Sequence, residues 1–166
     1  TGEHGAFLTE SLPGLEWTYS DIDQAGLDSQ KAWRAASGHD RLHGPLALDA
    51  SLPDWGEAEA ARPWDAVVSM NMVHIAPFAV AEGLFAGAGR VLATGGRLFL
   101  YGPFARKGVI APSNAAFRES LQRRNPEWGV RDLDKELLPL ASLGGLELRH
   151  VTDMPANNLA VVFERV

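Results

Sequence analysis

The chain of 166 residues contains no cysteine. This excludes a disulfide framework, a cysteine-ligated zinc site and a thiol nucleophile. Long apolar runs are missing as well: runs such as residues 98–101 and 159–163 are far shorter than the roughly 20 residues that a membrane-spanning helix needs. Residues 1–4 do not show the basic and then apolar order of a signal peptide. We therefore expect a cytoplasmic protein with no membrane partner.

An excess of positive charge is also lacking. The chain has 15 Lys and Arg residues against 21 Asp and Glu residues, which is a net charge of −6. Such a chain is not drawn to nucleic acid by bulk electrostatics, so we expect no nucleic-acid partner. His39 and His43 stand four residues apart, but no third ligand follows in order, and we predict no metal site. The expected partner is a small molecule, and the oligomeric state is left open.

What the chain does contain is an alternation of strand and helix patterns. Nearly continuous apolar runs at residues 64–70 and 97–101 are typical of strands buried in a parallel sheet. The alternation predicts an α/β fold with a doubly wound, mostly parallel Rossmann-like sheet and a C-terminal antiparallel hairpin. Helices are expected at residues 4–12, 24–37, 78–92, 113–124 and 133–143, and strands at residues 15–20, 44–48, 64–70, 97–101, 146–151 and 159–165.

The order of these patterns begins with a helix that has no strand before it. We interpret residues 1–166 as one domain whose first, central strand precedes Thr1. About 30–40 residues would supply that strand and a leading helix in a βαβ architecture.

Acidic residues follow two successive predicted strands, at the edge of the sheet where such folds bind ligands. Asp21 comes 19 positions after Gly2, close to the spacing of about 20 between a glycine-rich turn and an acid that binds ribose. Asp49 follows the next strand and is placed to accept a hydrogen bond from an adenine amino group. For both acids the alternative is a cap on the following helix. If a glycine preceded Thr1, the segment to Gly5 would read G-x-G-x-x-G.

The combination resembles the class I S-adenosylmethionine-dependent methyltransferases. Beside the turn and the two acids, the matching segments are residues 64–69, 73–75 and 91–98. Four later segments resemble a subgroup that includes the methyltransferase-like 26 proteins: residues 100–104, 111–117, 128–132 and 154–159.

The resemblance implies a seven-stranded sheet with the terminal hairpin inserted, and methyl transfer from S-adenosylmethionine to a small-molecule acceptor. The cofactor-binding residues that we predict are Thr1, Gly2, Glu3, Asp21, Ile22, Asp49, Ala50, Asn71 and Met72. His74 lies just past a further strand and Tyr101 ends the next one, and we predict catalytic and substrate-binding roles for both. Asn114 and Asn157 are predicted to orient a polar substrate. The alternatives are a polar residue at a helix start for His74, a half-buried strand aromatic for Tyr101, and helix-start or turn chemistry for the asparagines.

Two other functions remain open at this point. The possible G-x-G-x-x-G motif also suits a nicotinamide-dependent oxidoreductase, although Lys107 lies six residues after Tyr101 and does not form a Tyr-x-x-x-Lys pair. The small size and the lack of an obvious strong base suit a non-catalytic module that binds S-adenosylmethionine.

Overall fold

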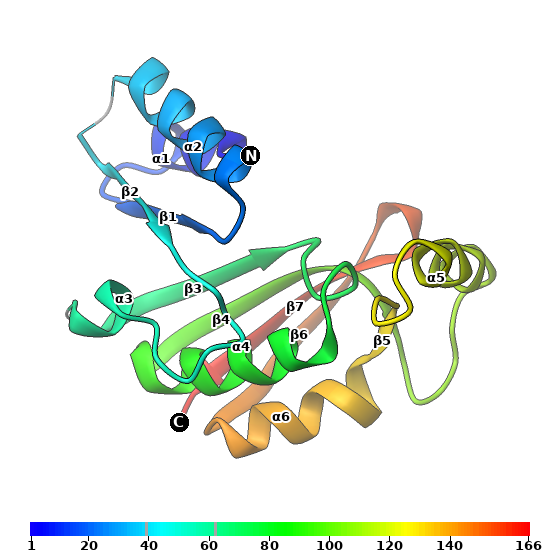
Figure 1. The fold of residues 1–166 in the computed structure, drawn as a ribbon. Helices are drawn as coiled ribbons and strands as arrows, with labels where there is room; N and C mark the ends of the chain where they lie inside the picture. The colour runs from blue at the N-terminus through cyan, green and yellow to red at the C-terminus, as the bar shows by residue number, and fades with distance from the viewer. Residues whose placement is uncertain (39, 62) are drawn as a thin grey trace. The chain divides into compact units, whose positions relative to one another are not determined.

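The structure, a computed structural model, describes residues 1–38, 40–61 and 63–166. His39, one of the two histidines considered above as a metal ligand, lies outside the described residues. The chain divides into two units (Figure 1). The first comprises residues 1–49 and 56–58, and the second comprises residues 50–55 and 59–166. The interpretation of residues 1–166 as one domain, with a strand before Thr1, stays a prediction.

The first unit has the element order α1 (Glu3–Ser11), β1 (Trp17–Asp21), α2 (Gln24–Ser37) and β2 (Leu42–Ala47). Strands β1 and β2 pair in parallel. Helix α2 has the predicted bounds because both ends carry strong local signals. Asp23 caps its start by accepting a hydrogen bond from the Gly26 N–H, and Gly38 follows its end in the left-handed conformation. Tyr19 and Leu42 lie in the core of this unit.

The second unit is built on a sheet with the strand order β3-β4-β7-β6, which are Trp64–Met70, Leu92–Ala105, Asn158–Arg165 and Leu146–Met154. Strands β3 and β4 are parallel, whereas β7 is antiparallel to both β4 and β6. A two-residue strand, β5 (Arg131–Asp132), pairs in parallel with the end of β4. The mixed α/β sheet and its C-terminal antiparallel hairpin are confirmed. In the described residues the strands form two sheets, β1–β2 and this one, and not one continuous seven-stranded sheet.

The helices of the second unit are α4 (Phe78–Val91), α5 (Pro112–Arg124) and α6 (Leu138–Leu143), with a π-helix η1 (Leu133–Leu137) and a 3-10 helix η2 (Pro155–Asn157). The short helix α3 (Glu57–Ala60) is divided between the two units. Helices α4 and α6 lie side by side (Figure 1). The Phe85 ring of α4 meets the Phe163 ring of β7 edge to face, with centroids 5.1 Å apart, and both side chains are fully buried.

Strand β4 is longer than the predicted strand at residues 97–101. It begins at Leu92 and continues through Gly102 and Pro103 to Ala105. Beyond Tyr101 the reason is its neighbours, because β7 pairs with β4 as far as Pro103 and β5 pairs with Phe104 and Ala105. Strand β3 differs in burial: all seven of its residues are half-buried or exposed. Among the described strands it pairs only with β4.

Helix α5 starts at Pro112, one residue before the predicted start, and Ala111 is its N-cap. Proline is favoured in the first helical turn because its missing N–H would be unpaired there anyway. The predicted helix at residues 133–143 has these bounds, but its first part is the π-helix η1, which continues directly into α6. Strand β5 has only two residues, too few to show a periodic pattern.

Glycines on α4 let the preceding segment lie directly against this helix. A Cβ atom at Gly83 would overlap the Ala50 carbonyl oxygen, and one at Gly87 would overlap the Trp55 ring. Trp55 is 7% exposed. The absence of side chains at these two helical positions therefore allows Trp55 to be buried against α4.

We predict that Gly87→Ala destabilises the protein, although alanine is the better helix former. The added methyl group overlaps a bulky ring, and overpacking of this kind costs about 1–3 kcal/mol. The matched control is Ala86→Gly at the exposed neighbouring position, where helix propensity alone costs about 1 kcal/mol. Chemical denaturation of both variants measures the two costs. A Gly87→Ala variant more stable than the parent protein contradicts this account of the packing.

Candidate functional site

The first unit begins with a turn that requires glycine at two positions. Gly2 has φ +107° and precedes α1, and its carbonyl oxygen accepts a hydrogen bond of 2.6 Å from the Tyr19 hydroxyl. This left-handed conformation disfavours any residue with a Cβ atom. A Cβ atom at Gly5 would lie 2.5 Å from the Tyr19 ring and 2.7 Å from Nε1 of Trp17. Helix α1 thus packs closely on β1, the task of the third glycine in G-x-G-x-x-G.

The Asp21 carboxylate holds the turn in which it lies. Its Oδ1 atom accepts hydrogen bonds from the backbone N–H groups of Ile22, at 2.8 Å, and Asp23, at 3.1 Å. Its Oδ2 atom packs where a side chain at Gly26 would stand. The residue that caps α2 is therefore Asp23, whereas Asp21 stabilises the turn before this helix.

The ends of β1 and β2 bring the two predicted acids to the same edge of their sheet. Asp21 is paired with Ala47, and the Leu48 N–H donates to the Asp21 carbonyl oxygen at 2.9 Å. Asp49 follows one residue later. Among the other predicted cofactor-binding residues of this unit, Ile22 is 68% exposed and the Thr1 carbonyl oxygen accepts a hydrogen bond from Ser29 Oγ at 2.7 Å. Glu3 is exposed in the first turn of α1.

In the second unit, the turn after β3 carries Asn71 and His74 to the end of β4. Asn71 has φ +56°, and its N–H donates to the Tyr101 carbonyl oxygen at 2.8 Å. A Cβ atom at Gly102 would lie 3.3 Å from His74 Nδ1 and 3.7 Å from Asn71 Oδ1. Asn71, His74, Tyr101 and Gly102 therefore form one cluster. Met72 lies half-buried in the same turn.

The His74 side chain is buried in apolar surroundings. It is 5% exposed, and its ring meets the Phe117 ring of α5 edge to face at 5.6 Å. Within the described part of the chain, its imidazole makes no hydrogen bond. Burial alone lowers the pKa of His74 from 6.5 to about 4. The imidazole is therefore neutral near pH 7, where one ring nitrogen accepts a hydrogen bond or a proton.

Asn114 and Asn157 lie together, where the tip of the β6–β7 hairpin meets the start of α5. Asn114 Nδ2 donates to the Asn157 carbonyl oxygen at 2.9 Å, and Asn157 Nδ2 donates to Ser113 Oγ at 2.8 Å. Asn157 and Ala156 both have left-handed backbones, with φ +56° and +58°. Asn114 is buried, and Phe117 follows it one helical turn later.

The predicted cofactor-binding residues are divided between the units. Thr1, Gly2, Glu3, Asp21, Ile22 and Asp49 belong to the first, and Ala50, Asn71 and Met72 belong to the second. Sequence reasoning missed Gly102 and Phe117 beside the His74 ring, and Arg131, which donates to the Ala76 carbonyl oxygen two residues beyond His74. These residue types carry no local signal for such a role, because only the fold brings them to the His74 turn.

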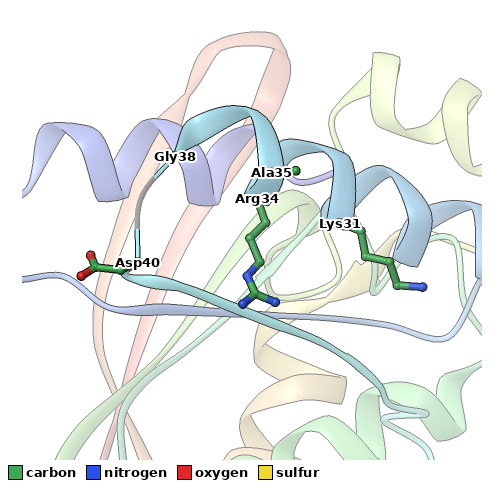
Figure 2. Close-up of a pocket in the computed structure, with 5 residues that line it drawn as sticks. All are labelled: Lys31, Arg34, Ala35, Gly38 and Asp40. Carbon is green, nitrogen blue, oxygen red and sulfur yellow. The ribbon is translucent and has the colours of Figure 1, made fainter.

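A hollow of about 450 Å³ lies elsewhere in the first unit (Figure 2). Its lining residues are Lys31, Arg34, Ala35, Gly38 and Asp40. Lys31 forms an ion pair with Asp28 at 3.2 Å, and Arg34 Nη1 donates to the Gly44 carbonyl oxygen at 2.9 Å. The hollow is at the C-terminal end of α2, away from the turn that joins Asp21 to this helix, and none of its residues was predicted.

Within residues 1–38, 40–61 and 63–166, no group of three or more His, Cys, Asp or Glu side chains is arranged to hold a metal ion. In the same part of the chain, no helix has the length and apolar character to cross a membrane.

Comparisons with known proteins identify the fold. A family model described as "Protein of unknown function (DUF938)" matches residues 1–165. The chain is similar to a putative O-methyltransferase from Nostoc punctiforme PCC 73102, with 21% identity and a TM-score of 0.77 over 96% of this chain and 48% of that one. It is also similar to an O-methyltransferase family 2 protein from Planctomyces limnophilus DSM 3776 in complex with apigenin, with 18% identity and a TM-score of 0.76 over 99% and 47%.

A third similar structure is the S-adenosylmethionine-dependent methyltransferase SibL in its apo form, with 17% identity and a TM-score of 0.76 over 97% of this chain and 46% of that one. The chain thus spans less than half the length of these solved structures. Together they show a Rossmann-like methyltransferase fold.

The burial of His74 predicts a pH-dependent loss of stability. The unfolded chain binds a proton at His74 near pH 6.5 and the folded chain only near about 4. The stability from neutral His74 is therefore complete above pH 6.5 and falls as the pH drops toward 4. Between pH 7 and 4.5, we expect Tm to fall by at least about 3 °C more than in His74→Gln, the shift that about 1 kcal/mol causes in a domain of this size.

Thermal melts followed by circular dichroism at a series of pH values measure this difference. The exposed His150 supplies the control, because His150→Gln should follow the parent protein at every pH. Parallel curves for the parent protein and His74→Gln would show that His74 titrates as a solvated residue.

Proposed function

We propose, since the chain belongs to the DUF938 family and has a methyltransferase fold, that it transfers a methyl group from S-adenosylmethionine to a small-molecule acceptor. The observation that carries this proposal is the glycine turn of the first unit. Gly2 and Gly5 there perform the backbone tasks of a glycine-rich nucleotide-binding turn, and Asp21 follows the next strand. The resemblance to the methyltransferase-like 26 proteins is part of the proposal.

The residues present fit the cofactor. Asp21 Oδ1 is engaged by its own turn, and we assign Oδ2 to the ribose hydroxyls. Asp49, at the end of the neighbouring strand, would contact the adenine amino group. We also assign Thr1, Gly2 and Glu3, at the start of α1, to the cofactor. We assign Ile22 to the adenosine part as well, together with Ala50, Asn71 and Met72 of the second unit.

When bound, S-adenosylmethionine supplies a methyl group already activated by the positive charge on sulfur. The chain's own residues need only orient the acceptor and receive its proton. His74 is neutral near pH 7 because its pKa is about 4, so it is ready to accept that proton. Its low basicity means that it receives the proton as the acceptor loses it during methyl transfer, and then passes it to water. Tyr101, half-buried at the end of the same cluster, donates or accepts a hydrogen bond to the acceptor.

Asn114 and Asn157 extend this site with uncharged polar groups. Each uses its side-chain nitrogen to join α5 to the hairpin tip, which leaves the side-chain oxygens to accept hydrogen bonds from the acceptor. The residues that we assign to the acceptor carry no formal charge near pH 7. This favours an uncharged polar acceptor.

Asp21→Asn should weaken binding of S-adenosylhomocysteine with little effect on folding. Asparagine retains one oxygen for the N–H groups of Ile22 and Asp23, whereas a charge-assisted hydrogen bond to ribose, worth about 1.5–3 kcal/mol, is lost. We expect Kd from isothermal titration calorimetry to rise at least about tenfold. The matched control is Asp23→Asn, which should keep Kd within about twofold because asparagine caps a helix as well as aspartate does.

Three results would count against the cofactor assignment. The first is a folded parent protein that does not bind S-adenosylhomocysteine. The second is an Asp23→Asn variant that weakens binding as much as Asp21→Asn does. The third is an increase in the Tm of the parent protein with NADH but not with S-adenosylhomocysteine. The last result would favour the nicotinamide-dependent oxidoreductase.

His74→Gln should lower kcat about 100-fold, a usual size for the loss of proton transfer, while Kd for S-adenosylhomocysteine stays unchanged. Methyl transfer from labelled S-adenosylmethionine to a panel of small phenols, alcohols and amines measures kcat. Tyr101→Phe tests the hydroxyl in the same assay. Full turnover by both variants would refute the catalytic assignments, and cofactor binding without turnover across the panel would favour the non-catalytic module.

A further inference from the structure

We propose that Arg131 is a positioning residue, whose guanidinium holds the turn at residues 71–78 in the shape that places His74 beside Gly102. Its importance for activity rests on the proposed function. Its effect on the position of the His74 ring does not rest on the proposed function, because NMR measures that effect without any substrate.

The Arg131 side chain ties the His74 turn to the segment before β5. Its Nη2 atom donates to the Ala76 carbonyl oxygen at 3.0 Å and to the Glu127 carbonyl oxygen at 2.6 Å. Ala76 is two residues beyond His74, and Glu127 is four residues before Arg131. One guanidinium nitrogen therefore bridges two backbone segments that are far apart in the sequence.

The guanidinium is also held from the side. Its central carbon lies 5.4 Å from the centroid of the Phe78 ring, which opens α4 directly after the turn. The Arg131 Nε atom is buried and has no hydrogen-bond partner in the described part of the chain. Buried donors are usually hydrogen-bonded, so the unpaired Nε shows that hydrogen bonding alone does not determine where this guanidinium lies. Its position is therefore set by the Phe78 ring and by the two carbonyl groups.

The backbone beside Arg131 supports the same turn. The Gly129 N–H donates to the His74 carbonyl oxygen at 3.0 Å. Strand β5 anchors this segment, because Arg131 is paired with Phe104 at the end of β4. The turn is thus held at His74 by Gly129 and at Ala76 by Arg131. The contacts of the His74 ring with Phe117 and Gly102 depend on both.

The charged neighbours of Arg131 do not act on His74 directly. Burial lowers the pKa of the Arg131 guanidinium and Glu136 opposes this effect, yet an arginine stays protonated throughout the usual pH range. The pKa of His74 responds to burial and to no charged group. A change in the His74 pKa after substitution of Arg131 therefore reports a change in how deeply the ring is buried.

The experiment compares Arg131→Met with Arg124→Met in the full chain. Arg124 is the matched control because its guanidinium also lies over an aromatic ring of the 127–131 segment, at 5.8 Å from the Trp128 centroid. Among the described residues, its side chain makes no hydrogen bond to the His74 turn. NMR titration of the His74 ring, assigned with His74→Gln, gives the pKa. We expect about 4 in the parent protein and in Arg124→Met, and a rise of at least about one unit in Arg131→Met as the ring gains solvent.

An unchanged His74 pKa in folded Arg131→Met overturns the proposal, and so does an equal rise in Arg124→Met. If Arg131→Met does not fold, Arg131→Lys takes its place and is expected to shift the pKa in the same direction. A lysine donates to one carbonyl group but cannot stack its head group on Phe78.

The parent protein supplies a test that needs no substitution. The Arg131 Nε–H should exchange with solvent far more slowly than the Nε–H of the exposed Arg124, and equal exchange rates overturn the proposal. In the methyl-transfer assay, Arg131→Met should lower kcat more than it raises KM. If the protein proves to be no methyltransferase, the NMR results still decide whether Arg131 positions His74.

Discussion

Strand β4 is the element on which the arrangement of the second unit depends, because it pairs with β3, β7 and β5. Its pairing with β3 ends where the Tyr101 carbonyl oxygen receives the Asn71 N–H, which starts the turn that leads to His74. Its pairing with β5 positions Arg131. A single strand therefore determines the positions of both His74 and Arg131, although these residues are 57 positions apart in the sequence.

Close approach of backbone to side chains is the second constraint, and it acts through glycine in both units. Gly5 allows α1 to lie against the Tyr19 ring, and Gly87 gives α4 room for Trp55. Gly102 leaves the space beside β4 into which the His74 ring fits. The candidate site thus depends on side chains that are absent as well as on those that are present, since a Cβ atom at Gly102 would lie 3.3 Å from the imidazole.

Where strong local signals stand in the sequence, prediction from sequence was accurate. Asp23 and Gly38 define the ends of α2 by capping, and β3 has the predicted bounds because apolar residues fill it between two breaks. Prediction failed where tertiary contacts outweigh local preference. β4 continues beyond the predicted residues 97–101 because β7 pairs with it as far as Pro103 and β5 pairs with Phe104 and Ala105.

The sequence by itself determined the order of the longer strands and helices, the glycine turn at Gly2 and the acid at Asp21, because each rests on neighbouring residues or on a fixed spacing. Only the tertiary structure decided that His74 is buried with a pKa of about 4 and that Arg131 holds its turn. Burial is a property of segments that meet from distant parts of the chain, and no pattern within one segment encodes it.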